Sequence, residues 1–147
     1  MMIAILKVLV IISLATSCLS TKTLNSEIDT LNGVWQAEYL EIEGQAGSPE
    51  AVKSILVTVK GNKLFVQLDG ENSRAKEVLF KIDSTKSPGQ IDISETGGQT
   101  ESVLGIYELS KDTLKVCLKA NSGAPRPDKF ETKPKSEQIL IQLKKIK

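Results

Sequence analysis

The sequence of 147 residues contains no histidine. A chain without imidazole cannot use the Ser–His–Asp triad or a Cys–His pair, and it cannot build a zinc site from histidine ligands. It has only two arginines, Arg74 and Arg126, and its 19 basic residues are balanced by 18 acidic ones. Binding of nucleic acid needs a basic surface, so this composition argues against that class of partner.

Cysteines are also few, with one at Cys18 and one at Cys117. A disulfide between them would need an oxidising compartment, and lipid attachment at Cys18 would remove one partner. We interpret Cys117 as a lone thiol in a strand, on the outer face between Lys115 and Lys119 or at a bulge, where the flanking lysines could lower its pKa. No catalytic residues, no metal site and no cofactor are predicted, and we expect the protein not to be an enzyme.

The long apolar run is confined to residues 1–17, which carry one early cation, Lys7, and end in small residues. The run is shorter than the roughly 20 apolar residues of a membrane-spanning helix. This pattern is typical of a secretory signal, and a buried N-terminal helix is the alternative.

The segment Leu14-Ala15-Thr16-Ser17-Cys18 resembles the bacterial lipobox. The resemblance implies that Cys18 receives a diacylglyceryl group, and two or more acyl chains anchor a protein stably to a membrane. Residues 18–23 would then be a tether, and the family's sorting rule favours the outer membrane because no aspartate follows Cys18. Ala15 stands where the family prefers leucine. Cleavage after Ala15 or Ser17, which would give a soluble periplasmic or secreted protein, is the alternative.

Residues 24–147 are predicted to form one domain that begins with a short helix. Leu24, Ile28 and Leu31 fall on one helical face, and Asn32-Gly33 ends the pattern. Ser48 followed by Pro49 predicts a second short helix.

The rest of the domain shows the period-2 alternation of half-buried strands. The predicted strands cover residues 34–42, 55–60, 64–68, 77–82, 91–93, 103–109, 114–118 and 139–143. No long helix separates them, which disfavours a parallel sheet, and eight antiparallel strands can close into a barrel that leaves no exposed edge. We therefore predict an all-β, eight-stranded antiparallel up-and-down barrel, with a two-sheet β-sandwich as the alternative.

Gly33-Val34-Trp35 opens the first predicted strand and resembles the Gly-x-Trp pattern of the lipocalins and other calycins. The resemblance implies that Trp35 plugs the closed end of the barrel and that a cation from the last strand, Lys144 or Lys145, stacks on it. Such a cation–π contact contributes about 1 kcal/mol.

A wider resemblance covers nearly all of the domain. Its segments are Leu31–Trp35, Leu104–Leu109, Asp112–Cys117, Arg126-Pro127 with Phe130, and the lysine-rich last strand. Together they are similar to a lipocalin-like domain family of unknown function that is expanded in planctomycetes. The resemblance implies a barrel-like fold and frequent export, and it implies no activity.

Two groups of residues are candidates for a binding site. The first could line a pocket inside the barrel, although a filled core is the first interpretation because eight short strands enclose little space; it comprises Tyr39, Val57, Val66, Phe80, Ile93, Val116 and Ile141. The second is the loop with Pro125, Arg126, Pro127 and Phe130, which either packs on the barrel or presents Arg126 to a protein partner.

These observations predict a non-enzymatic, exported lipoprotein of the cell envelope, monomeric and anchored by its lipid. Its expected role is binding or protein interaction. The alternatives are a carrier of a small apolar ligand and a protein similar to envelope protease inhibitors.

Lipidation at Cys18 predicts that metabolic labelling with a fatty-acid analogue marks the wild-type protein and not Cys18→Ala. The reason is that the thioether needs the Cys18 sulfur. Equal labelling of both proteins, or a mature N-terminus other than Cys18, would show that the lipobox interpretation is wrong.

Overall fold

The computed structural model describes residues 26–68, 74–97 and 101–147. The predicted signal, the lipid-attachment residue Cys18 and the tether lie outside these residues. Residues 26–31 are helical. The other elements are β1 (Gly33–Ile42), β2 (Gln45–Ala46), α2 (Pro49–Lys53), β3 (Leu56–Lys60), β4 (Lys63–Gln67), β5 (Lys76–Asp83), β6 (Gly89–Glu95), β7 (Val103–Ser110), β8 (Thr113–Lys119) and β9 (Gln138–Lys145).

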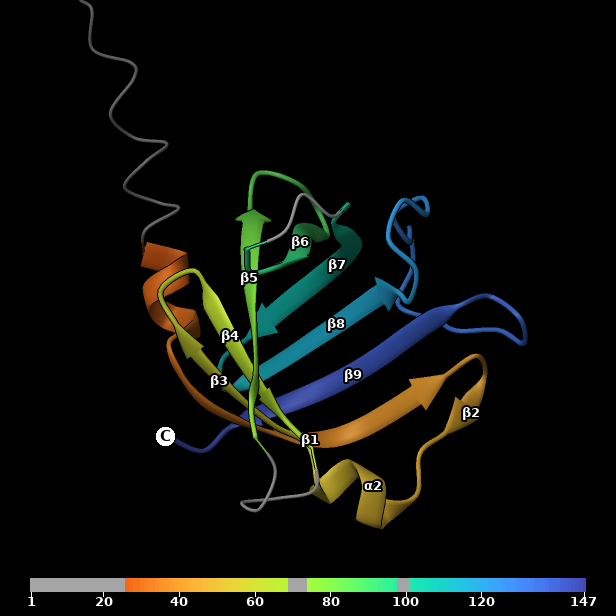
Figure 1. The fold of residues 1–147 in the computed structure, drawn as a ribbon, viewed down its shortest axis with the longest axis horizontal. Coiled ribbons are helices and arrows are strands. Elements are labelled where there is room, and N and C mark those ends of the chain that lie inside the picture. The colour runs from red at the N-terminus through yellow and green to blue at the C-terminus, as the bar shows by residue number, and fades with distance from the viewer. Residues whose placement is uncertain (1–25, 69–73, 98–100) are drawn as a thin grey trace, which may run out of the picture.

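The strands form one closed antiparallel sheet (Figure 1). From β3 to β9 each strand pairs with the next, β1 pairs with β3, and β1 also pairs with β9. The last pairing runs from Trp35 opposite Lys145 to Ile42 opposite Ile139 and closes the cylinder. The predicted eight-stranded up-and-down barrel is confirmed, and the alternative of a two-sheet sandwich is wrong. A ninth strand, β2, was not predicted; it has two residues and pairs with the end of β1.

Local sequence accounts for the short elements between the strands. The β3–β4 turn is tight, with Lys60 opposite Lys63, and it uses Gly61 in the left-handed region at φ +59°. Ser48 caps α2 by accepting a hydrogen bond from the Ala51 amide on its Oγ at 3.2 Å, and Pro49 occupies the first turn. The cap of α2 follows the sequence prediction.

Strand β1 is interrupted by a β-bulge at Glu38. Ala37 lies opposite Leu143 and Tyr39 lies opposite the next residue, Gln142, so Glu38 is the extra residue. A bulge shifts the alternation of side chains between the two faces of a sheet. Beyond Glu38, Leu40 therefore lies opposite the inward-facing Ile141.

Trp35 closes one end of the barrel. Its side chain is completely buried, and its indole Nε1 donates a hydrogen bond to the Leu31 carbonyl at 2.8 Å. The Nζ atom of Lys145 lies 5.6 Å from the centroid of the indole ring and donates to the Thr30 carbonyl at 2.9 Å. The predicted stacking cation is thus Lys145, whereas Lys144 is exposed on the outer face.

Gly33 allows the two chain ends of the barrel to meet. Its φ of +136° disfavours any residue with a side chain, and a Cβ there would collide with the Lys147 carbonyl oxygen. The Val34 amide donates to that same oxygen at 3.0 Å, and the Ile146 amide donates to the Val34 carbonyl at 2.8 Å. Position 33 of the Gly-x-Trp pattern therefore requires glycine, because a side chain there would collide with the backbone of Lys147.

Replacing Trp35 with alanine is expected to lower the free energy of unfolding by about 3–5 kcal/mol, because it leaves a large cavity and an unpaired Leu31 carbonyl. Denaturant unfolding measures this change. Native Trp fluorescence should be blue-shifted until global unfolding, and an emission maximum typical of exposed indole would contradict the burial of Trp35.

The two neighbouring lysines provide a matched pair for the cation–π contact. Lys145→Gln is expected to cost about 0.5–1 kcal/mol, because it removes the charge over Trp35, whereas Lys144→Gln should leave stability unchanged. Chemical denaturation of both variants tests this, and equal losses would show that the stacked charge contributes nothing.

Candidate functional site

The barrel encloses a cavity of about 190 Å³ that is lined by strands β3 to β9, the end of the N-terminal helix and Ile55. The barrel is therefore not completely filled, contrary to the first interpretation of its sequence. Six of the seven predicted lining residues contribute to the wall, and they are Val57, Val66, Phe80, Ile93, Val116 and Ile141.

The wall of this cavity is apolar. Among the described residues that line it, the hydroxyl group belongs to Tyr107, and that group donates to Glu27 at 2.7 Å. Burial, followed by the nearby Glu27 carboxylate, raises the pKa of Tyr107 well above its usual range. The phenol stays neutral and hydrogen-bonded to Glu27, so the cavity is a dry space suited to an apolar molecule.

Tyr39 does not line the cavity, and this prediction is wrong because of the bulge at Glu38. Tyr39 is 39% exposed, and its hydroxyl donates to Glu41 on the outside of the barrel. Glu41 also accepts from Thr132, which in turn accepts from the Gly44 amide at 2.8 Å. The hydrogen bonds from Thr132 and Tyr39 lower the pKa of Glu41, so this carboxylate ties the long β8–β9 loop to β1.

Sequence reasoning missed Leu118 and Gly105, which shape the cavity together. A Cβ at Gly105 would collide with the Leu118 side chain, so glycine makes room for that leucine to reach the lumen. A glycine within a strand marks such a close approach. Gly105 is visible within a predicted strand of the sequence, but the sequence does not show which side chain fills the space beside it.

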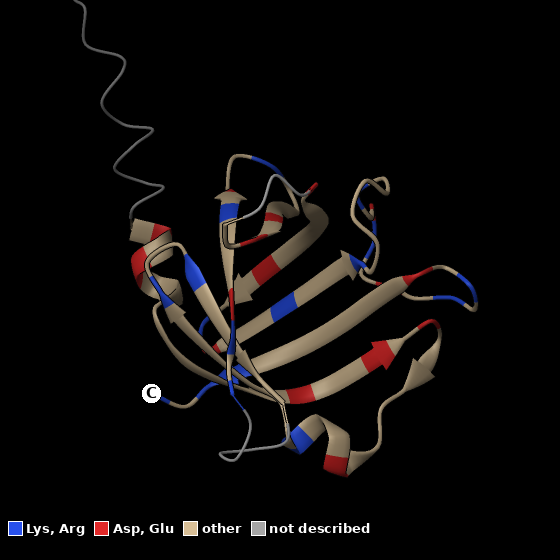
Figure 2. Cartoon of the chain, viewed as in Figure 1, with Lys and Arg blue, Asp and Glu red and all other residues tan. Residues whose placement is uncertain are grey.

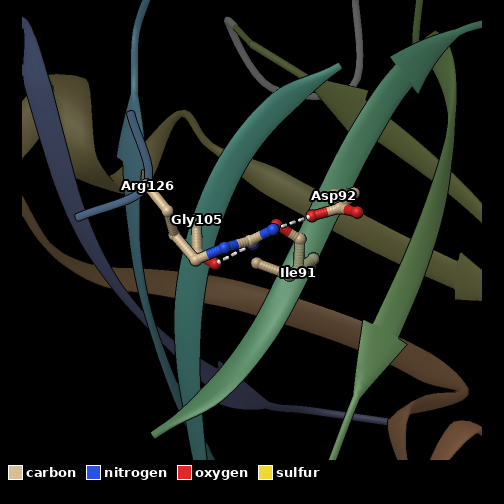
Figure 3. A network of polar contacts seen from close by, with 4 residues as sticks. All are labelled: Ile91, Asp92, Gly105 and Arg126. Carbon is tan, nitrogen blue, oxygen red and sulfur yellow. Dashed lines mark hydrogen bonds and ion pairs between the residues drawn. The ribbon is translucent and has the colours of Figure 1, made fainter. Parts of the chain in front are cut away.

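Arg126, in the loop between β8 and β9, reaches across the outside of the barrel (Figure 3), whereas Pro125 in the same loop is exposed. The Nη1 atom of Arg126 donates to the Gly105 carbonyl at 2.7 Å and the Ile91 carbonyl at 3.1 Å, and Nη2 forms an ion pair with Asp92 at 2.7 Å. The guanidinium therefore joins the loop to β6 and β7, and the expectation that the loop presents Arg126 to a partner is wrong.

The rest of this loop is also held against the barrel. Pro127 is buried, and the Nζ atom of Lys115 lies 5.6 Å from the centroid of the Phe130 ring. These contacts agree with the alternative that the loop packs on the barrel.

Cys117 points outward from β8, as expected, but the same loop covers it completely. Its thiol is fully buried and lies 3.7 Å from the Glu131 carbonyl oxygen. Burial raises the pKa of the Cys117 thiol, which outweighs the influence of Lys119. A buried thiol with a raised pKa is a poor nucleophile.

Charged groups elsewhere are scattered over strands and loops with both signs mixed (Figure 2). A hollow of about 670 Å³ lies outside the barrel beside Pro88 and Phe130, and its lining mixes acidic and basic side chains. Within the described residues, no three histidine, cysteine, aspartate or glutamate side chains gather as a metal site would require. In the same part of the chain, no helix is long and apolar enough to cross a membrane.

No protein-family model matches this chain, and searches of curated proteins and of solved structures found no match.

Proposed function

We propose that this protein is a non-enzymatic, exported lipoprotein that binds a small apolar molecule inside its barrel. The observation that carries the proposal is the 190 Å³ cavity, whose described lining is apolar apart from the Tyr107 hydroxyl. An engineered apolar cavity of about 150 Å³ stays dry and binds benzene. A space of this size and lining is therefore large enough for a short hydrocarbon group.

The loop contacts support this proposal over a protein-interaction role. Arg126 is engaged with β6 and β7, and Thr132 with Glu41. A loop held in this way stiffens the wall around the cavity. Anchoring through Cys18 remains part of the proposal on the strength of the lipobox resemblance alone, and it would place the cavity at a membrane surface.

Octan-1-ol is the probe that tests the cavity. We expect saturable one-site binding by titration calorimetry, with a negative heat-capacity change because apolar surface is buried. Val66→Trp should abolish binding, because the indole would fill the cavity that Val66 lines.

The matched control is Phe65→Trp, which changes the next residue on β4, on the opposite face of the strand. This variant should bind octan-1-ol like the wild type. Circular dichroism and thermal unfolding establish that both variants are folded. Absence of binding to the wild type, or unchanged binding to folded Val66→Trp, would refute the proposal.

A further inference from the structure

The inner face of the barrel changes from apolar to charged at the ends of β5 and β6. Val66 lines the cavity and lies directly opposite Lys76, and residues opposite each other in an antiparallel pair share a face of the sheet. By the same rule Glu95 shares the face of Val78, which is buried and in phase with the cavity-lining Phe80. Lys76 and Glu95 therefore stand on the inner rim, with Nζ and Oε1 2.9 Å apart.

These two side chains border a recess of about 410 Å³ that adjoins the cavity. The recess and the cavity share Ile93 as a wall residue, and the recess is also lined by Glu101 and Ser122. A molecule seated in the apolar cavity thus has beside it a recess lined by both charged and apolar side chains. An elongated ligand could occupy both.

The charges of the recess favour a cation. Among the described residues that line it, Lys76 is the basic one and Glu95 and Glu101 are the acidic ones, which leaves one negative charge in excess. The Lys76–Glu95 pair has side-chain exposures of 66% and 60%, and exposed ion pairs are weak enough for a ligand to displace. The whole chain is close to neutral, so the preference comes from these nearby groups.

We infer that the ligand is a short amphiphilic amine, with its apolar tail in the barrel cavity and its ammonium head in the recess beside Glu95 and Glu101. This inference rests on the proposed function, because it needs the cavity to bind the tail. The ammonium donates hydrogen bonds to Glu95 in place of Lys76. The cavity volume accommodates a tail of about six to nine carbon atoms, by comparison with the benzene-binding cavity of about 150 Å³.

Three octyl probes that differ only in the head group separate the two proposals: octan-1-ol, octylammonium and octanoate. The neutral alcohol reports on the cavity, and the two ions report on the recess. At low salt we expect octylammonium to bind about two- to fivefold more tightly than octanoate, a ratio typical of exposed charge contacts. The ratio should shrink in high salt, because screening weakens these contacts.

Substitutions at the rim should change the ratio and leave octan-1-ol binding unchanged. Glu95→Gln combined with Glu101→Gln should remove the preference for octylammonium, and Lys76→Gln should increase it. Glu108→Gln on β7 is the matched control, because this carboxylate is exposed and lines the separate outer hollow rather than the recess.

The outcomes distinguish the two proposals. If octan-1-ol fails to bind, the cavity proposal fails and this inference falls with it. If octan-1-ol binds but octanoate binds as well as octylammonium or better, the head-group inference is overturned and the cavity proposal stands. Loss of the preference in Glu108→Gln would likewise overturn the assignment to the rim.

Discussion

The pairing of β1 with β9 is the interaction on which the rest of the structure depends. It closes the sheet, and the buried Trp35 sits on β1 at the end of that seam, opposite Lys145. An open sheet of eight strands would expose two edges and one apolar face, whereas a closed one hides both. The indole makes this closure specific, because its Nε1 must reach the Leu31 carbonyl and its face must lie under the Lys145 ammonium.

Closure also creates the cavity. Once Trp35 and Leu31 seal one end, the inward-facing aliphatic residues of β3 to β9 enclose a space that they do not fill completely. Polar groups that could compete with an apolar ligand are kept out of it, since the hydroxyl of Tyr107 is occupied by Glu27. The same geometry that stabilises the fold therefore provides a dry interior.

Strand alternation was enough to predict the closed barrel and six lining residues, because side chains in a strand alternate strictly between its two faces. The place of Trp35 came instead from the resemblance to the Gly-x-Trp pattern. The alternation rule failed for Tyr39, where one extra residue at Glu38 reverses the alternation and no glycine or proline marks the bulge. It also could not place Arg126. The partners of that guanidinium are the Asp92 carboxylate and two backbone carbonyls of β6 and β7, which come together only after the sheet has formed.

The loop between β8 and β9 packs on the outside of the wall that encloses the cavity. Its contacts are polar and specific, with Arg126 on β6 and β7 and Thr132 on Glu41 of β1. Each contact joins the loop to the outside of the barrel wall. Binding of an apolar molecule, as proposed above, would therefore meet a wall that these contacts already hold in place, which reduces the ordering cost of binding.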